Sequence, residues 1–351
     1  MNSTIHLLAD YGLGTFSIAG AQPFAGLIMH NRVVALDALV PLARQLGHEL
    51  RNTRSVRECL EHWHTNEPAL AEVAYCLAQS HWRHPALLAT PVDVALLRVH
   101  APIEDPRQFF CSGANYRQHV IDLILDQHRE EYENSLSPEQ RLAYAHELMD
   151  KRAAGEPYVF SKPWSSLCGP FDPVAVADAS LQPDWELELA VIIGREAWQL
   201  DEADAMDAVA GFTLVNDITN RALVHRADLR AIGSDWVMGK GQPGYSPMGP
   251  YLIPARLVPD PHHLRMTLRL NGEVMQNETS ADMIFRIPRL LAYLTQRVKL
   301  YPGDILITGS PAGNGSHYNR FLRPGDVMES EIEGLGIQRT TCVAMPKPRQ
   351  L

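Results

Sequence analysis

Three carboxylates alternate along one short segment of the chain. In DWELELAVIIG, residues 184–194, the acids Asp184, Glu186 and Glu188 lead into an apolar run. Alternate residues of a strand point to the same face, so the three side chains would lie together at the edge of a core. Like charges in that position repel one another, and each is costly to remove from water. Such an arrangement needs a feature that neutralises it.

A divalent cation is the simplest such feature. Asp217, in GFTLVND, follows a second apolar strand and would emerge at a sheet end, where it can join Glu186 and Glu188. Carboxylate oxygens suit a hard cation such as Mg²⁺, Mn²⁺ or Ca²⁺, and the lack of cysteine or histidine in the set disfavours zinc. The spacing leaves a second interpretation equally open, in which the acids lie on a solvated strand face or pair with arginines.

The composition narrows the class of protein. The 351 residues carry a formal net charge of −10, which argues against a general binder of nucleic acids or membrane surfaces. No apolar run is long enough for a transmembrane helix, and the first residues lack the pattern of a signal peptide. The five cysteines are scattered and odd in number, as expected of free thiols. We therefore expect a cytoplasmic protein.

Residues 1–101 are expected to form a separate N-terminal α/β domain. Strands are predicted at 24–29 and 32–36, and a capping box begins at Ser55. A helix is predicted over residues 68–79. The region shows no cluster of catalytic residue types, so we interpret it as a packing or dimer-supporting domain.

Residues 102–351 have the sequence pattern of a β-rich domain. Short strands separated by turns predominate, and a long polar helical stretch over 123–156 interrupts them with a capping box at Ser137. An Asn-Gly hairpin turn is predicted at 271–272, and an amphipathic helix is predicted over 288–299. Two Pro-Gly-Asp turns, at 302–304 and 324–326, each precede a predicted strand. The predicted class is α+β with mixed sheets rather than alternating βαβ units.

Eight stretches together resemble the fumarylacetoacetate hydrolase superfamily, in its acylpyruvase-like branch. They occur in family order from about Phe109 to the C-terminus and span more than half of the chain: SGANYRQHVID, FSKPWSSLCGP, DWELELAVIIG, GFTLVNDITNR, DWVMGKG, SADMIFRIPRLLAYLTQ, YPGDILITGSPAGNG and RPGDVMESEIEGLG. The resemblance implies that residues 102–351 are the catalytic domain, a β-sheet roll or sandwich, and that 123–156 is a helical insertion.

The resemblance also implies a metal site. The family's ligands fall on Glu186, Glu188 and Asp217, which would hold Mg²⁺ or Mn²⁺, with Ca²⁺ as an alternative. Asp184 is not a usual ligand and would lie beside the site or in solvent. Some members have a fourth carboxylate where this chain has Ser112, so water is expected to complete the coordination.

The family's catalytic residues fall on His119 as general base and on Lys240, which would stabilise an oxyanion or enolate. Asp122 lies one helical turn after His119, where it can orient the imidazole, although the family has glutamate there. Expected substrate contacts are made by four residues: Arg221, as a clamp for a carboxylate, Lys162, Thr308 and Tyr116.

The implied activity is metal-dependent hydrolysis of a carbon–carbon bond. The substrate would be a small 2-oxo acid or 1,3-diketone, attacked by water that His119 activates. Oxaloacetate-type decarboxylation or keto–enol isomerisation on the same metal site is the alternative. A non-catalytic, metal-stabilised binding protein is a third interpretation, which the joint presence of base, lysine and acids disfavours.

The helical insertion and the assembly of the chain complete these expectations. Both ends of the stretch 123–156 meet site motifs, so we predict a lid over the pocket, with Leu142, Tyr144 and Leu148 on its packed face. A dimer-contact arm is the alternative. We expect a homodimer that has no nucleic-acid or membrane partner.

Overall fold

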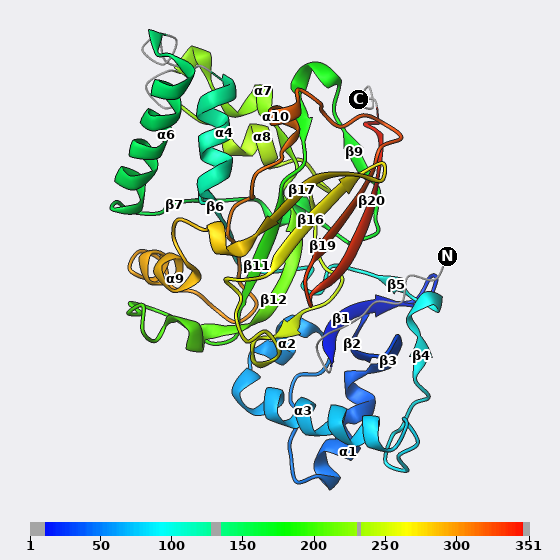
Figure 1. The fold of residues 1–351 in the computed structure, drawn as a ribbon. Coiled ribbons are helices and arrows are strands. Elements are labelled where there is room, and N and C mark those ends of the chain that lie inside the picture. Colours follow the sequence, from blue (N-terminus) through cyan, green and yellow to red (C-terminus); the bar gives the residue numbers. More distant parts are fainter. Residues whose placement is uncertain (1–10, 128–134, 230–232, 347–351) are drawn as a thin grey trace.

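Three larger sheets organise the part of the chain that the computed structural model describes, namely residues 11–127, 135–229 and 233–346. Figure 1 shows the N-terminal sheet with its helices at the bottom and the other two sheets above it. Helices gather on one side of the upper part. The chain is thus mixed α+β and rich in sheet, as predicted.

The N-terminal sheet is antiparallel and packs against helices. Its strands, in spatial order, are β4 (Val92–Asp93), β3 (Arg32–Ala35), β2 (Phe24–Met29), β1 (Gly12–Ser17) and β5 (Arg98–Val99). The helices are α1 (Val40–Gln45), α2 (Val56–Leu60) and α3 (Trp63–Gln79). Ser55 caps α2 by accepting the Glu58 N–H at 3.1 Å, which is one half of the predicted capping box. The Glu58 carboxylate accepts from Arg54 instead of closing the box. These elements form one apolar cluster that continues into the second sheet.

The second sheet runs through the middle of the molecule and carries the alternating acids. Its spatial order is β15 (Ile253–Pro254), β12 (Val209–Asn216), β11 (Leu187–Ile193), β18 (Ile305–Ile307), β6 (Phe109–Gly113) and β7 (Tyr158–Ser161). All neighbours are antiparallel except β18 and β6. Every residue of β11 is buried, so both faces of this sheet are covered.

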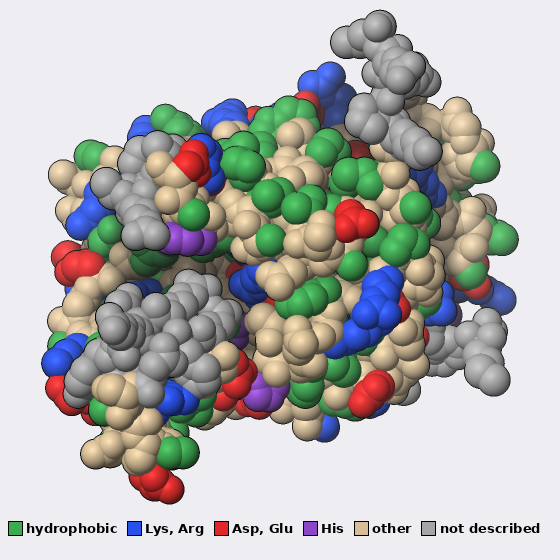
Figure 2. All heavy atoms as spheres, turned by 90° about the horizontal axis from the view of Figure 1, so that it is seen from above, with side chains coloured by type: hydrophobic (Ala, Val, Ile, Leu, Met, Phe, Trp, Pro, Cys, Tyr) green, Lys and Arg blue, Asp and Glu red, His purple; other side chains and the backbone are tan. Residues whose placement is uncertain are grey.

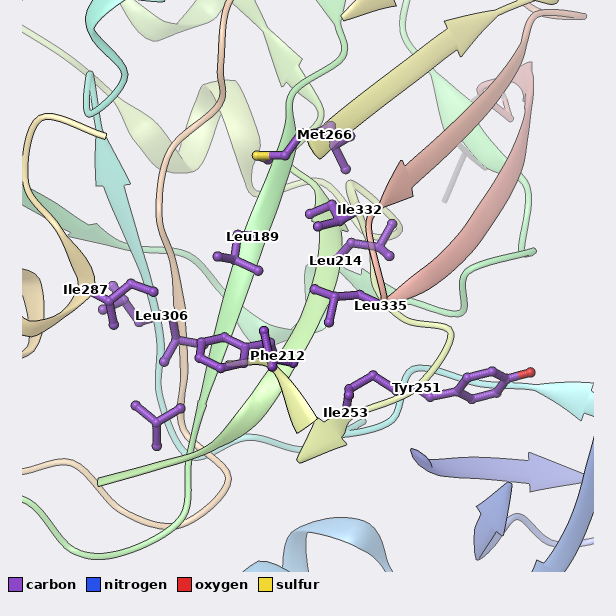
Figure 3. Packing of buried hydrophobic residues seen from close by; sticks show 14 of the residues in the cluster. Leu189, Phe212, Leu214, Tyr251, Ile253, Met266, Ile287, Leu306, Ile332 and Leu335 are labelled. Atoms are coloured by element: carbon purple, nitrogen blue, oxygen red, sulfur yellow. The ribbon is translucent and has the colours of Figure 1, made fainter. Parts of the chain in front are cut away.

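The third sheet covers one face of the second. It consists of β17 (Glu273–Thr279), β16 (Arg265–Leu270), β19 (Val327–Ile332), β20 (Gly336–Ala344) and β9 (Val174–Val176). Met266 and Leu268 alternate inward and meet Leu189 and Leu214 of the second sheet in one core (Figure 3). The Asn271-Gly272 hairpin and the strands after both Pro-Gly-Asp turns form as predicted.

Two short ladders and a small number of helices complete the upper part. The ladders are β10 (Pro183–Asp184) with β13 (Thr219–Asn220), and β14 (Ser246–Pro247) with β8 (Leu167–Cys168). The helices are α4 (Arg117–Gln127), α6 (Pro138–Ala153), α7 (Arg221–Val224), α8 (Trp236–Lys240), α9 (Ile287–Thr295) and α10 (Gly315–Tyr318). None of the helices in the described ranges has both the length and the hydropathy needed to span a membrane.

In the described residues, the predicted helical insertion contains the end of α4 and all of α6, and Ser137 forms the predicted capping box at the start of α6. Helix α6 packs against α4 through Ala145 and Met149, which are buried with Ile121. The predicted packed face was wrong at Leu142, which is 43% exposed, because the small side chain of Ala145 is what faces α4. Residues 128–134 of the predicted lid lie outside the described part. Its function as a lid stays a prediction.

Candidate functional site

The register of β11 and β12 brings the predicted metal ligands together. Leu187 pairs with Asn216, and the Asp217 N–H donates to the Glu186 carbonyl at 2.8 Å just beyond this pair. Glu188 lies on the face of β11 opposite to Leu187, because side chains alternate along a strand. One carboxylate oxygen from each of Glu186, Glu188 and Asp217 lies within 4.8 Å of the others, and all three residues are buried.

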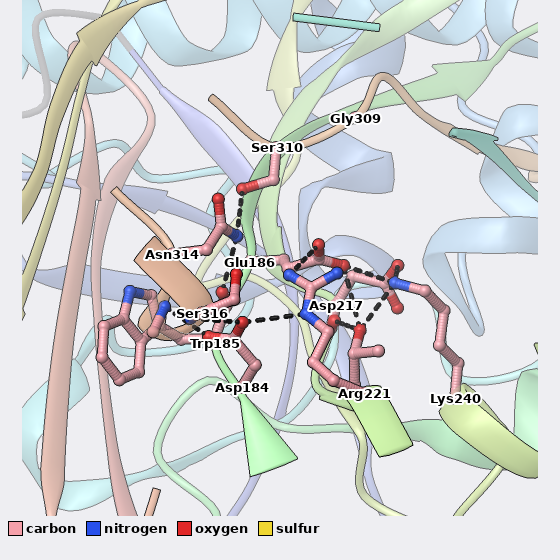
Figure 4. Close-up of polar contacts among 12 residues, drawn as sticks. Asp184, Trp185, Glu186, Asp217, Arg221, Lys240, Gly309, Ser310, Asn314 and Ser316 are labelled. Carbon is pink, nitrogen blue, oxygen red and sulfur yellow. Dashed lines mark hydrogen bonds and ion pairs between the residues drawn. The ribbon is translucent and has the colours of Figure 1, made fainter. Parts of the chain in front are cut away.

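Two lysines enter this acidic cluster from other elements. The Lys240 ammonium, at the end of α8, donates to Asp217 Oδ2 at 2.5 Å, to Thr219 Oγ1 at 2.7 Å and to Glu186 Oε2 (Figure 4). The Lys162 ammonium donates to the other oxygen of Asp217 at 2.5 Å. All three protons of the Lys240 ammonium are therefore engaged within the cluster.

Arg221 connects the remaining acids. Its Nε donates to Asp184 Oδ2 at 2.8 Å, and its Nη2 donates to Glu186 Oε1 at 2.6 Å (Figure 4). Asp184 also accepts the N–H groups of Gly315 at 2.6 Å and Ser316 at 3.2 Å. The expectation that Asp184 lies beside the site is met, while its placement in solvent is wrong, because the carboxylate is fully buried between these donors.

The charges explain how the ionisation of the acids differs. Burial opposes ionisation of Glu186, but Arg221 and Lys240 outweigh it and lower the pKa of this carboxyl. Burial raises the pKa of Glu188 well above its usual range, and the neighbouring carboxylates of Asp217 and Glu186 add to the effect. Glu188 thus differs from the other acids, because it makes no direct ion pair with a described residue.

Glu188 is the acid that most needs a metal ion. It accepts the Gly309 N–H at 2.7 Å and makes no ion pair with any described residue. Gly309 has a φ of +98°, which a side chain would strain, so glycine allows the loop to aim its N–H at the carboxylate. Four buried acids face three cations in the cluster, which leaves one negative charge for an added cation to balance.

The donor set fits a hard divalent cation. Glu186, Glu188 and Asp217 supply only oxygen atoms, and their spacing suits ions that bind oxygen. Ser112, which lines the same cavity, is 3% exposed, and its Oγ has no hydrogen-bond partner in the described ranges. A water molecule on a bound ion would satisfy this hydroxyl, and the completion of the coordination by water stays a prediction.

The acids form the floor of a cavity of about 680 Å³. His119 lines it from the first turn of α4, and Lys240 and Arg221 line it beside the carboxylates. Asn115 fixes the turn before α4, because its Nδ2 donates to the carbonyls of Phe285 at 3.0 Å and Thr308 at 2.8 Å. Seen from above, the surface is hollowed on the left, with histidine and basic side chains at the rim (Figure 2).

His119 is placed to act as a base. Its side chain is 7% exposed, and burial together with the Arg221 guanidinium lowers the pKa of His119 to about 4. The imidazole is therefore neutral at physiological pH. The structure does not join Asp122 to it. The Asp122 carboxylate instead accepts Gln118 Nε2 at 2.7 Å, because both residues lie on the same face of α4, four positions apart.

We expect the acid limb of the activity profile to lie near pH 4 rather than near 6.5. A base must be neutral, so activity is present above the folded-state pKa and falls as the pH drops through about 4. The depressed pKa also implies that His119 contributes stability above pH 6.5 that is lost between pH 6.5 and 4. A profile of kcat/KM at saturating metal checks this, and half-loss of activity near pH 6.5 would contradict it.

The profile of the fumarylacetoacetate (FAA) hydrolase C-terminal family matches residues 108–343, about two thirds of the chain. The chain belongs to this family. All the predicted ligand and catalytic positions fall inside the matched range. Membership supports an enzyme, and the predicted superfamily and fold type are confirmed.

Curated relatives within the family carry two different activities in their names. A mitochondrial oxaloacetate tautomerase of Rattus norvegicus is 35% identical over 239 residues, 68% of this chain and 66% of the relative. A 2,4-didehydro-3-deoxy-L-rhamnonate hydrolase of Sphingomonas sp. is 41% identical over 187 residues, 52% of this chain and 64% of the relative. This chain therefore matches slightly less than two thirds of the length of either protein.

A solved structure extends the similarity beyond the family profile. A fumarylacetoacetate hydrolase from Exiguobacterium antarcticum aligns with a TM-score of 0.69 at 25% identity, over 95% of this chain and 99% of that one. The alignment includes the N-terminal residues that the family profile leaves out. The overall arrangement of sheets is thus shared with a known member of the family.

Three of the four predicted substrate contacts lie outside the cavity lining. Tyr116 is fully buried in the main core, with its hydroxyl 3.5 Å from Thr308 Oγ1, and neither residue lines the pocket. Lys162 lies behind Asp217, where it also donates to the Tyr245 carbonyl at 2.8 Å. In this structure these three residues support the site rather than border the substrate space. Arg221 borders it but is bound to carboxylates.

Sequence reasoning missed two groups that complete the cluster. Thr219 donates to the Asp217 carbonyl and accepts from Lys240, and Gly309 donates to Glu188. A signal for Thr219 was present, since it follows Asp217 by two residues and so shares its face in an extended segment. The amide of Gly309 could not be found in this way, because its role depends on the conformation of a loop.

Proposed function

We propose that the protein is a divalent-metal-dependent hydrolase that cleaves a carbon–carbon bond in an acylpyruvate-type 2-oxo acid or a related 1,3-diketone. The supporting observation is that one cavity combines three buried carboxylates with a neutral imidazole and an apolar side. The apolar part of the lining includes Phe160, Trp236 and Leu123. The hydrolase among the relatives agrees with this reaction class.

Charge balance favours an anionic substrate. A divalent ion held by Glu186, Glu188 and Asp217 would act as a Lewis acid toward the oxygens of a carboxylate and a 2-oxo group. With such an ion, the formal charge of the cluster changes from minus one to plus one. A simple acylpyruvate carries one negative charge, so its binding would complete the neutralisation of this buried cluster.

The residues of the chain account for the proton transfers. Neutral His119 takes a proton from water, whose oxygen attacks the carbonyl of the acyl group. The bond between that carbon and the methylene carbon then breaks, which yields a carboxylic acid and the enolate of pyruvate. Protonated His119 returns its proton to the methylene carbon. Lys240 can donate to the developing oxyanion only after it releases one of its present acceptors.

Keto–enol isomerisation of a 2-oxo acid is the second candidate. It moves a proton between the carbon beside the oxo group and the oxo oxygen, and one imidazole can carry that proton without an oriented water. The contact of Asp122 with Gln118 favours it, since no described carboxylate orients His119. The tautomerase among the relatives agrees with this reaction.

Proton NMR in D₂O with acetylpyruvate and Mg²⁺ separates the two reactions. Hydrolysis releases acetate and pyruvate, with deuterium in the new methyl group. Isomerisation leaves the carbon skeleton intact and only accelerates exchange of the methylene protons. Release of both acids supports the first proposal, and fast exchange without release favours the second. Neither exchange nor release, on a panel of acylpyruvates and oxaloacetate, would contradict both.

A further inference from the structure

Two aromatic side chains, stacked face to face, form an apolar wall on one side of the cavity. The rings of Phe160 and Trp236 are stacked, with centroids 4.4 Å apart and planes inclined by 14°, and both residues line the pocket. Tyr158 holds the indole in place, because Trp236 Nε1 donates to its hydroxyl at 2.6 Å. The wall therefore keeps a fixed orientation before any ligand binds.

The wall is built on the elements that also carry the charged floor. Phe160 and Tyr158 share one face of β7, as residues two apart in a strand do. Trp236 opens α8, and Lys240 follows four residues later on the same face of the helix. The Lys240 ammonium lies 5.9 Å from the ring centroids of both Phe160 and Trp236. A ligand held by the carboxylate floor thus meets the wall directly.

Packing in a hydrophobic core explains the position of Phe160 and Trp236 less well than contact with a ligand does. Core aromatics are enclosed, but Trp236 is only partly buried, and it lies beside Val237 and Met238, which are 64% and 39% exposed. The Asp235 side chain caps α8 by accepting the Met238 N–H at 3.0 Å, which fixes the start of the helix and with it the indole. The stack thus presents apolar aromatic surface to a cavity that is otherwise polar at its base.

We propose, building on the hydrolase function, that Phe160 and Trp236 form the subsite for the acyl group of the substrate. The enzyme then prefers 2-oxo acids whose acyl group is aromatic or extended and planar over those with a short alkyl group. Stacking against such a wall adds to the burial of apolar area, and a pocket of this kind discriminates by about 10- to 200-fold. The charged floor holds the 2-oxo acid end, which all such substrates share.

The decisive quantity is the ratio of kcat/KM for benzoylpyruvate to that for acetylpyruvate. In Trp236→Leu and in Phe160→Leu this ratio should fall by about 10- to 100-fold, because both variants lose the stack. Trp236→Phe keeps an aromatic face and should retain most of the preference. The control is Trp198→Leu, which changes a tryptophan that is 47% exposed and does not line the cavity, and it should leave the ratio unchanged.

A binding measurement keeps this inference separate from the hydrolase proposal. Benzoylformate and pyruvate are 2-oxo acids that this reaction cannot cleave, so calorimetric titration compares their affinities without turnover. The wild type should bind benzoylformate about tenfold more tightly, and Trp236→Leu should remove the difference. If the protein prefers benzoylformate in binding but does not hydrolyse acylpyruvates, only the proposed hydrolysis is wrong. If acylpyruvates are hydrolysed and both ratios are unchanged in the leucine variants, the subsite is wrong.

Discussion

Replacing Glu188 by glutamine should abolish the response of the protein to divalent metal ions without lowering the melting temperature of the metal-free form. Glu188 is buried and lacks a cationic partner, and its raised pKa means that ionisation at neutral pH destabilises the folded state. The stability that its protonated form provides is present below pH 4.5 and is lost as the pH rises through the folded-state pKa. The neutral amide removes this penalty and can still accept the Gly309 N–H.

Thermal unfolding of metal-stripped protein with and without Mg²⁺ or Mn²⁺ measures the effect. The wild type should gain about 2.7 kcal/mol at a metal concentration 100 times its Kd, and Glu188→Gln should gain little. Turnover should fall by roughly 10³-fold, since Lewis-acid assistance supplies several kcal/mol. Glu331→Gln is the control, because Glu331 is an exposed residue of β19. A variant that is stabilised by metal as strongly as the wild type would remove Glu188 from the site.

His119→Gln should lower kcat by roughly 10²–10⁴-fold while leaving the metal-induced rise in melting temperature intact. The imidazole lines the cavity but makes no hydrogen bond to the carboxylate cluster among the described residues, so its loss removes the base and not a ligand. Steady-state kinetics at saturating metal, together with the melting curves, check both parts of this result.

Two comparison variants locate the base more closely. His225 lines the same cavity, and His225→Gln tests whether any neighbouring imidazole suffices. Asp122→Asn should stay close to the wild type, because Asp122 is bound to Gln118 in this structure. A loss in Asp122→Asn as large as that in His119→Gln would mean that the two residues meet when substrate binds. Near wild-type turnover in His119→Gln would require a different base.

The ligand set was accessible from the sequence because it depends on local rules. Alternation along a strand places Glu186 and Glu188 on one face, and Asp217 ends the neighbouring strand. The counter-charges were not accessible in the same way. Lys162 and Lys240 meet Asp217 from positions 55 and 23 residues away, and no spacing rule covers such contacts.

The two interpretations of the acids also proved to be compatible. Arg221 pairs with Asp184 and Glu186, as the arginine alternative proposed, while Glu188 makes no ion pair with a described residue and leaves a place for a metal ion. From the sequence spacing, the metal site and the arginine pairing were alternatives, because spacing does not show which acid each cation contacts. The homodimer, the cytoplasmic location, the domain boundary at residue 101 and the lid remain predictions.

The most direct test of the central proposal is the release of pyruvate from an acylpyruvate by one sample of metal-stripped protein, before and after addition of Mg²⁺ or Mn²⁺. The buried carboxylates Glu186, Glu188 and Asp217 predict no release above background without metal and full recovery at about one ion per chain. Release at the full rate from the stripped protein would contradict the account.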